Sequence, residues 1–404
     1  MNLKYQNKQM GASATKDLFI EIALRYDDVL LRLMLVNKLA ADVVLEYRVD
    51  ELNFSKTISE PPMHLIPYAK RLRISSLSYL TRANPIHLYL DKINWSNTCM
   101  PVMTRLTHLV SPFVTEYMLR SLPVLSDLTI TDNCDHSDFS VCSRLTKLTT
   151  IGNAHVGDTL VCLNIIKGHA SCGTSLRSLT LQSATADIVA PLDALHCCFV
   201  VIPDSYIPYI SSLTEFVAAS STIADGFLCN ARQLRKLTIR SCDIQLNDSV
   251  IEKLTSLTYL CLDRTPVTGC CLGSLTSLQK LDINLFEDEC LVALSSLTSL
   301  TDLRLGAESI VDEDITTLTN LTALKIRPVY GTSSITDRGI AQLKNLTSLS
   351  VRDNKCITDF GVSHLALLTR ISIRNSKLSN DCVNRIRNYR YVYTGSHGAD
   401  ILVK

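Results

Sequence analysis

The chain has 404 residues, of which 46% are hydrophobic, and its 40 basic and 39 acidic side chains leave a formal net charge of +1. A nearly neutral chain lacks the positive excess with which proteins attract nucleic acid or anionic membranes, so we expect neither as a partner. No stretch of eighteen apolar residues occurs, which argues against a membrane-spanning helix.

The 15 cysteines follow no spacing typical of a metal site or a disulfide framework. There is no Cys-x-x-Cys pair, and the adjacent pairs Cys197–Cys198 and Cys270–Cys271 are badly placed for a shared metal or a relaxed disulfide. The N-terminal segment also lacks the apolar core of a secretion signal. We therefore expect reduced, mostly buried thiols in an intracellular protein of the cytoplasm or nucleus.

Residues 13–47 differ from the rest of the chain because they contain neither Gly nor Pro and carry apolar side chains at helical spacing. The side chains that define one apolar face are Ile22, Leu30, Leu33, Val36 and Leu39. This spacing predicts two or three short helices, with Asp27-Asp28 as a break or cap between them.

The middle of this segment resembles an F-box, in which a leucine-rich helix leads to a V-C-K-like turn. The residues that carry the resemblance are Ile22, Leu30, Leu31, Leu33, Leu35 and Val36. The resemblance implies that a Skp1-like protein docks on residues 13–47 and links a bound target to a cullin-type ubiquitin ligase. Two features depart from the F-box pattern: Asp17-Leu18 lacks the usual proline, and Ala40 stands where a tryptophan is common. The alternative is a helical cap, which a solenoid needs to shield its first repeat.

The rest of the chain repeats the phrase L-x-x-L-x-L. Clear copies begin at Leu125, Leu176, Leu234, Leu257, Leu278, Leu300, Leu321, Leu346 and Leu368, and weaker copies at Leu106, Leu145, Leu195 and Leu213. From Leu195 onward, successive copies begin 18 to 25 residues apart. This period is typical of leucine-rich repeats.

The spacing of the phrase predicts the shape of one repeat. Alternation in the L-x-L core sends both leucines to one face of a short strand, and the leucine three positions earlier turns inward beside them. The remaining residues return behind the strand as short helices, as in ITDRGIAQLKNL, where Thr336 or Asp337 is the expected N-cap. One repeat cannot bury its own apolar side, so neighbours stack. We predict an α/β leucine-rich-repeat solenoid, a curved arc with parallel strands on the concave face and short helices on the convex face.

Within this class, the segment ITDRGIAQLKNLTSLSVRDNKCITDFGVSHLALL resembles cysteine-containing, ribonuclease-inhibitor-like repeats. We expect an N-terminal F-box-like segment or cap over residues 1–60, repeats over 61–393 and a tail over 394–404. The repeats should be irregular over 61–230, with degenerate early copies (AKRLRI, PIHLYL), and regular over 231–393. An interval of 31 residues between two copies predicts an insertion from His155 to Gly173.

The strand positions that flank the inward leucines should point out on the concave face. In the seven repeats from Leu234, these 21 positions hold nine basic and three acidic residues. The residues predicted to bind a partner there are Arg240, Lys280, Arg304, Lys325, Arg327, Arg352, Arg370 and Arg374. Such a basic patch suits an acidic or phosphorylated target, because the arginine fork engages two oxygens at once. The alternative is that these residues only keep an exposed strand face soluble.

Several fragments carry catalytic or metal-binding residue types without the required partners. The glycines of Gly168–Gly173 lack the lysine of a phosphate loop, and His169 with Cys172 is half a zinc site at most. The run Asp135–Asp138 falls in a turn, where polar residues are expected. We therefore predict no enzyme activity, no cofactor and no metal.

Three functions fit these features. The first is a substrate adaptor that recruits a protein target to a cullin-type ubiquitin ligase. The second is a regulatory binding protein similar to ribonuclease inhibitor, whose N-terminal helices are only a cap. The third, an internalin-like surface adhesin, fits the L-T-x-L phrasing but not the absence of a secretion signal.

Overall fold

A computed structural model of the chain describes residues 51–53, 71–74, 85–90, 101–133, 137–224, 226–244, 246–284, 291–306, 310–326, 334–352, 354–374, 378–379, 382 and 391–393. The segment 13–47, and with it every F-box-like residue, lies outside the described residues.

The chain forms two compact units. Unit 1 comprises Met1–Leu176 and Thr185–Asp187, and unit 2 comprises Arg177–Ala184 and Ile188–Lys404. Among the described residues of unit 1, the strands are β1 (Glu51–Asn53), β2 (Arg71–Ile74), β3 (His87–Leu90), β4 (His108–Ser111), β5 (Asp127–Asn133), β6 (Ser137–Asp138), β7 (Lys147–Ile151), β8 (Ala154–His155) and β9 (Cys162–Ser171), and the helix is α4 (Glu116–Arg120). Strand β10 (Ser178–Asp187) has residues in both units.

The strands of unit 2 that follow are β11 (Ala194–Cys198), β12 (Val201–Ile202), β13 (Glu215–Ala219), β14 (Thr222–Ile223), β15 (Lys236–Arg240), β16 (Tyr259–Asp263), β17 (Lys280–Asn284), β18 (Asp302–Gly306), β19 (Ala323–Ile326), β20 (Ser348–Arg352), β21 (Arg370–Arg374) and β22 (Tyr391–Tyr393). Its helices are α5 (Asp248–Ile251), α6 (Asp312–Ile315), α7 (Asp337–Ala341) and α8 (Asp359–Ser363), with 3₁₀ turns η3 (Asp204–Tyr209), η4 (Leu228–Asn230), η5 (Cys270–Ser274) and η6 (Leu291–Ser296).

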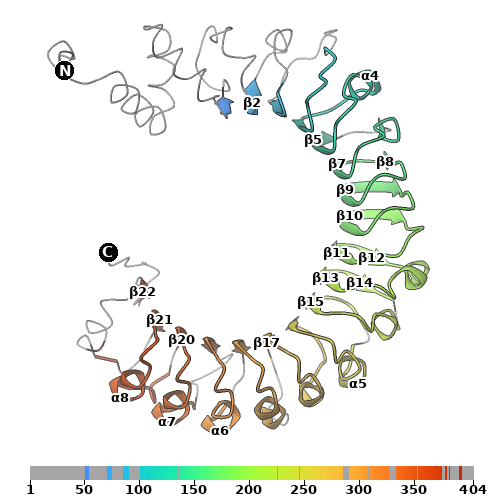
Figure 1. Cartoon of the computed structure of the whole chain (residues 1–404). Coiled ribbons are helices and arrows are strands. Elements are labelled where there is room, and N and C mark those ends of the chain that lie inside the picture. The colour runs from blue at the N-terminus through green and yellow to red at the C-terminus, as the bar shows by residue number, and fades with distance from the viewer. Residues whose placement is uncertain are drawn as a thin grey trace, which may run out of the picture. The chain divides into compact units, whose positions relative to one another are not determined.

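The strands stack in parallel with the leucine phrases in register. In unit 2, Leu281 of β17 pairs with Leu303 of β18, and Leu303 pairs with Leu324 of β19. These three side chains are at most 1% exposed, and burial of each contributes roughly 1.5–3 kcal/mol. Within unit 2 the strands line the inner side of a curved stack and the helices its outer side (Figure 1). The predicted leucine-rich-repeat solenoid is confirmed.

The weak early copies of the phrase also form strands. Leu72 of β2 pairs with Leu88 of β3, and both side chains are fully buried. The prediction of degenerate repeats (AKRLRI, PIHLYL) is therefore confirmed for these two strands.

The predicted insertion from His155 to Gly173 is wrong, because this segment belongs to a repeat of its own. We call the stretch from the start of one phrase to the start of the next a coil, since it makes one turn of the solenoid. Leu160-Val-Cys-Leu163-Asn-Ile165 is a copy of the phrase, and Leu163 pairs with Leu148 of β7. The predicted start of the next weak copy at Leu195 is also wrong. Leu195 pairs with Leu179, which is the second leucine of its phrase, so the copy that contains Leu195 begins three residues earlier, at Leu192. The coils that begin at Leu145, Leu160 and Leu176 are thus only 15 or 16 residues long, below the usual period.

In these short coils the segment behind the inner strand is itself extended, so the prediction of a helix behind every strand is wrong here. Strand β8 of the 15-residue coil pairs with the end of β9 in the next coil through Ala154 and Ala170. Strands β12 and β14 pair in the same way in two coils of ordinary length, ahead of η3 and η4. An extended chain advances about 3.3 Å per residue and a helix only about 1.5 Å, so a coil of 15 residues closes only with extended limbs. Helices α5 to α8 occur where the coils are longer.

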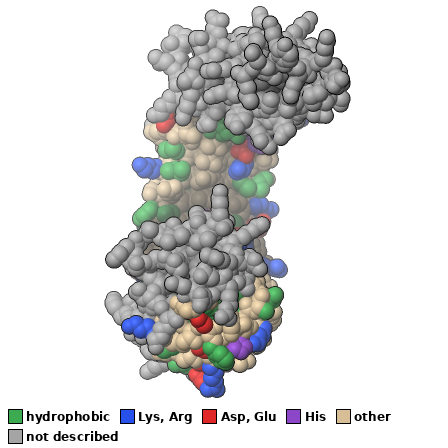
Figure 2. Space-filling view, turned by 90° about the vertical axis from the view of Figure 1, so that its left-hand side faces the viewer, with side chains coloured by type: hydrophobic (Ala, Val, Ile, Leu, Met, Phe, Trp, Pro, Cys, Tyr) green, Lys and Arg blue, Asp and Glu red, His purple; other side chains and the backbone are tan. Residues whose placement is uncertain are grey.

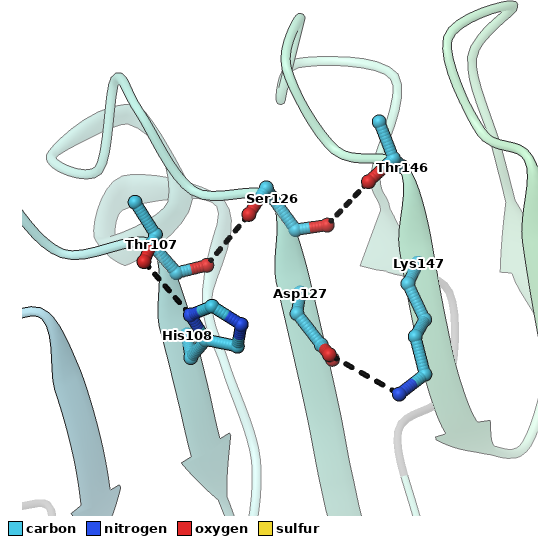
Figure 3. A network of polar contacts seen from close by, with 6 residues as sticks. All are labelled: Thr107, His108, Ser126, Asp127, Thr146 and Lys147. Atoms are coloured by element: carbon cyan, nitrogen blue, oxygen red, sulfur yellow. Dashed lines mark hydrogen bonds and ion pairs between the residues drawn. The ribbon is translucent and has the colours of Figure 1, made fainter.

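Where a serine or threonine follows the first leucine of the phrase, its hydroxyl joins that coil to the one before. Ser126 Oγ donates to the carbonyl of Thr107 at 3.1 Å, and Thr146 Oγ1 donates to the carbonyl of Ser126 at 3.1 Å (Figure 3). The donors of the same hydrogen bond in unit 2 are Thr214, Thr258, Thr301, Thr322, Thr347 and Thr369. This ladder explains the threonine of the L-T-x-L phrase.

A second ladder explains the I-T-D-x-G motif. Thr336 caps helix α7, as predicted, through a hydrogen bond from the Arg338 amide to its hydroxyl. The Thr336 amide donates to Asp312 Oδ1 at 2.8 Å, so the first residue of one helix holds the cap of the next coil. A Cβ on Gly339 would collide with the Asp312 carboxylate, which is why glycine stands there.

Eleven of the described cysteines are free, but Cys270 is disulfide-bonded, and its partner lies outside the described residues. The expectation that all thiols are reduced is therefore wrong at Cys270. Among the described residues, no helix combines the length and hydropathy that crossing a membrane requires.

Candidate protein-binding face

The outward side chains of β15 to β21 form the candidate site, which we call the strand face. On β15, Leu237 and Ile239 are completely buried, whereas Lys236 and Arg240 are exposed and Thr238 is half-buried. Alternation of this kind follows from the pleat of a strand. Because the strands share one register, the outward residues stand in rows that run across the coils.

The structure describes the side chains of five of the eight residues predicted to bind a partner. Arg240, Lys280, Arg304 and Arg370 are exposed, and Lys325 is half-buried. Of the other three, Arg327 lies outside the described residues, as do the side chains of Arg352 and Arg374, although the backbones of β20 and β21 are described. The role of all eight in binding stays a prediction.

Carboxylates are interspersed with these cations. Arg304 lies beside two of them, at 3.9 Å from Asp282 and 3.6 Å from Asp302. Lys236 Nζ lies 3.2 Å from Glu215 Oε2 of β13. Figure 2, which views the molecule from the side, likewise shows positive and negative side chains scattered among neutral ones on the described surface. The strand face is therefore of mixed charge, with fewer unneutralised cations than the sequence predicts.

Tyr259 stands between two cations of the strand face. It is half-buried, and its partners in the same row are Lys236 of β15 and Lys280 of β17. Burial raises the pKa of the Tyr259 phenol, so it stays neutral at physiological pH. Tyr259 occupies one of the 21 outward positions predicted from the sequence but is not among the residues predicted to bind; an aromatic residue between two lysines was the available signal.

Arg240 extends across to the neighbouring strand. Its guanidinium donates to Cys261 Sγ of β16 at 3.4 Å. The thiol beneath it is only 2% exposed, so Cys261 fixes the arginine and is not itself a contact residue. This hydrogen bond holds the charge of Arg240 over β16, the strand that carries Tyr259.

Unit 1 carries a comparable mixed row on its strands. Asp127 of β5 and Lys147 of β7 form an ion pair at 3.2 Å (Figure 3). The rings of His87 and His108 stack on β3 and β4 with centroids 4.1 Å apart. These contacts join neighbouring coils and leave no excess of one charge.

The fragments that carry catalytic residue types take structural positions. His169 contacts Thr185 Oγ1 at 2.9 Å and Asp187 Oδ2 at 3.0 Å, all exposed on the outer strands of unit 1. Burial raises the pKa of Cys142 to about 11 and of Cys172 to about 12, which keeps both thiols protonated and unreactive. Among the described residues, no three His, Cys, Asp or Glu side chains gather as a metal would need.

The geometry defines a leucine-rich-repeat solenoid with an exposed, polar strand face. No family model and no curated protein sequence matches the chain. Similar solved structures include an internalin (inlF) from Listeria monocytogenes, 19% identical over 70% of this chain and 84% of that one, with a TM-score of 0.49. A leucine-rich-repeat protein from Leptospira interrogans is 14% identical over 85% and 95%, with a TM-score of 0.48.

The ectodomain of a plant membrane receptor kinase from Arabidopsis thaliana, GASSHO1/SCHENGEN3, was solved in complex with CASPARIAN STRIP INTEGRITY FACTOR 2. It is 16% identical over 86% of this chain and 51% of that one, with a TM-score of 0.47. The parallel, in-register strands of the chain itself define the fold.

Proposed function

We propose that this protein is a non-enzymatic scaffold that holds a protein target on the strand face of unit 2. The observation that carries the proposal is the row structure of β15 to β21, in which seven strands in one register present polar and charged side chains. The backbone of these strands is fixed by pairing on both sides, so their side chains are preorganised for binding.

The charge of this face favours an acidic or phosphorylated segment as the target. Among the described outward side chains of β15 to β21, the basic ones are Lys236, Arg240, Lys280, Arg304, Lys325 and Arg370, and the acidic ones are Asp263, Asp282 and Asp302. Basic side chains therefore remain in excess on this face although the whole chain is nearly neutral. The same neutrality favours a protein over nucleic acid as partner.

Site-specific photo-crosslinking tests the proposal. A photoreactive amino acid replaces Thr238 or Ser350 on the strand face, and in a matched control it replaces the exposed Arg338 of α7 on the outer side. We expect both strand-face positions of the full chain to capture the same protein from an extract and the α7 position not to capture it. Capture from α7 alone, or equal capture from all three positions, contradicts a strand-face site.

A second proposal concerns the N-terminal segment and rests on the F-box resemblance. We propose that residues 13–47 dock a Skp1-like protein, so that the target is presented to a cullin-type ubiquitin ligase in the cytoplasm or nucleus. The test is pull-down of the full chain with a purified Skp1-like protein. Leu31→Asp with Leu33→Asp should abolish capture, whereas Arg304→Gln should not change it. No capture by the native chain supports the alternative, a helical cap.

A further inference from the structure

The cations of the strand face differ in how far they are neutralised. Lys236 is paired with Glu215 at 3.2 Å, and Arg304 lies within 4 Å of both Asp282 and Asp302. A partner that takes these cations must compete with carboxylates already beside them. Their attraction for an incoming anion is therefore weak.

Arg240 and Lys280 are different. Both are exposed, and neither forms an ion pair with a carboxylate among the described residues. Lys280 is the row neighbour of Tyr259, and Arg240 reaches over the same strand β16 through its hydrogen bond to Cys261. Two available cations thus flank one half-buried aromatic ring, a combination typical of the residues that dominate protein interfaces.

Resting on the proposed function, we propose that Arg240, Tyr259 and Lys280 form the contact point for an acidic peptide segment of the target. One aspartate or glutamate carboxylate of that segment binds between the two cations. A neighbouring apolar side chain packs on the ring of Tyr259. The rest of the strand face contributes shape and register.

Carboxylate fits this cluster better than phosphate. Asp263 is the strand partner of Arg240, and Asp282 is the strand partner of Cys261, so two negative charges border the cluster. Together with Arg240 and Lys280 they leave the surroundings of the cluster without net charge, so the second charge of a dianionic phosphate gains little net attraction and adds to the cost of desolvation. One donor group of Arg240 is already engaged by Cys261, which weakens the two-pronged grip that phosphate recognition uses.

Fluorescence anisotropy with three synthetic peptides tests the inference. The peptides share one neutral twelve-residue framework with a central leucine and carry three glutamates, three phosphoserines or three glutamines. The full chain is compared with the double variant Arg240→Gln/Lys280→Gln and with the matched control Lys236→Gln/Arg304→Gln, which removes the same charge from paired positions. Thermal melts verify that each variant folds as the native chain does.

We expect the glutamate peptide to bind the native chain at least tenfold more tightly than the glutamine peptide and no less tightly than the phosphoserine peptide. Arg240→Gln/Lys280→Gln should weaken glutamate binding at least tenfold, and Tyr259→Ser at least threefold. The control pair should change it less than twofold. Equal losses in both double variants, preference for phosphoserine, or no preference for glutamate would each overturn the inference.

The two proposals fail in distinguishable ways. If the glutamate preference is absent but Thr238 and Ser350 still crosslink the same protein, the strand face binds a target by other chemistry. If crosslinking from the strand face fails, the scaffold proposal itself is wrong.

Discussion

A left-handed backbone conformation recurs at one position of the phrase, directly after the inner strand in five coils and inside the long strands β9 and β10 in two. The residue at this position stands four positions after the first buried strand residue of the phrase, and φ there lies between 47° and 100° in seven successive coils. The residues are Gly152, Lys167, Ser183, Phe199, Ser220, Ser241 and Arg264. Six of the seven carry a Cβ, which costs about 1–2 kcal/mol in this region. Pairing of the inner strand with its neighbours on either side holds this left-handed conformation in place.

Substitution at Ser220 tests this strain. Ser220→Gly should raise the free energy of unfolding by up to about 1 kcal/mol, because glycine adopts positive φ without a steric penalty. Ser220→Val should lower it by about 1–2 kcal/mol, because a β-branched side chain crowds this conformation further. Chemical denaturation measures both. Ser350→Gly in the ordinary strand β20 is the control and should lower the free energy of unfolding. If glycine lowers it at both positions, the positive φ of Ser220 is not strained.

A single carboxylate also makes the stability of unit 2 depend on pH. Burial alone would raise the pKa of Asp248, but hydrogen bonds donated by Cys271 and Thr268 outweigh it and lower the pKa to about 2. An unfolded aspartate titrates near 3.9, so the folded state binds this proton less readily than the unfolded state. The stabilisation is present above about pH 4 and is lost as the pH falls toward 2.

Comparison of the native chain with Asp248→Asn measures this contribution. Above pH 5 the native chain should be more stable by about 1–2 kcal/mol, a value reduced for partial exposure of the carboxylate. Between pH 4 and pH 2 the difference should shrink toward zero. A difference that is constant from pH 6 to pH 2.5 would mean that the hydrogen bonds are not made by the charged form.

At the scale of elements, the helices of unit 2 are too short to be stable alone. Helices α6, α7 and α8 have four or five residues, far fewer than an isolated helix needs in water. Each is held by its neighbour: Asp312 accepts from Thr336, Asp337 from Thr358 at 2.6 Å, and Asp359 from Ser379 at 2.8 Å. The helices therefore form as a consequence of stacking.

A double-mutant cycle isolates this link. Gly339→Ala should destabilise the native chain by about 1–3 kcal/mol, because the new Cβ meets the Asp312 carboxylate. In the background of Asp312→Ala the carboxylate is gone, and Gly339→Ala should be close to neutral. The expected coupling is about 1–3 kcal/mol by denaturation, and additive effects would show that the two residues do not meet.

At the scale of the whole molecule, each coil contacts chiefly the coils next to it, so stability is a sum of coils and their interfaces. Any two coils with intact phrases can stack, because the inward leucines and the threonine ladder recur at the same positions.

Deletion of one whole coil should therefore be tolerated. Removal of residues 300–320 joins Ser299 to Leu321 and lets β17 pair with β19 in the same register. Circular dichroism should show a cooperative melt lowered by only a few degrees. Removal of residues 300–309 instead breaks the phase of the phrase and should lower the melting temperature by more than about ten degrees. Equal effects of the two deletions would contradict nearest-neighbour stacking.

The regular coils could be predicted from the sequence because their leucines repeat at a constant distance. The short coils could not, since Leu160-x-x-Leu163-x-Ile165 falls outside the expected period, and only the pairing of its strand with β7 identifies it as a copy of the phrase. The strand face could be predicted as a set of outward positions. Its charge balance could not, because Asp282 and Asp302 neutralise Arg304 only through the register between neighbouring strands.

The sequence by itself determined that this protein is a leucine-rich-repeat solenoid, since burial of periodic leucines leaves one way to stack. The tertiary structure decided that the short coils have extended segments behind their strands and why threonine, aspartate and glycine accompany the leucines. It also decided which cations of the strand face lie beside a carboxylate. The physical reason is that these features are contacts between residues about 15 to 25 positions apart. They depend on which coil lies beside which, and in what register.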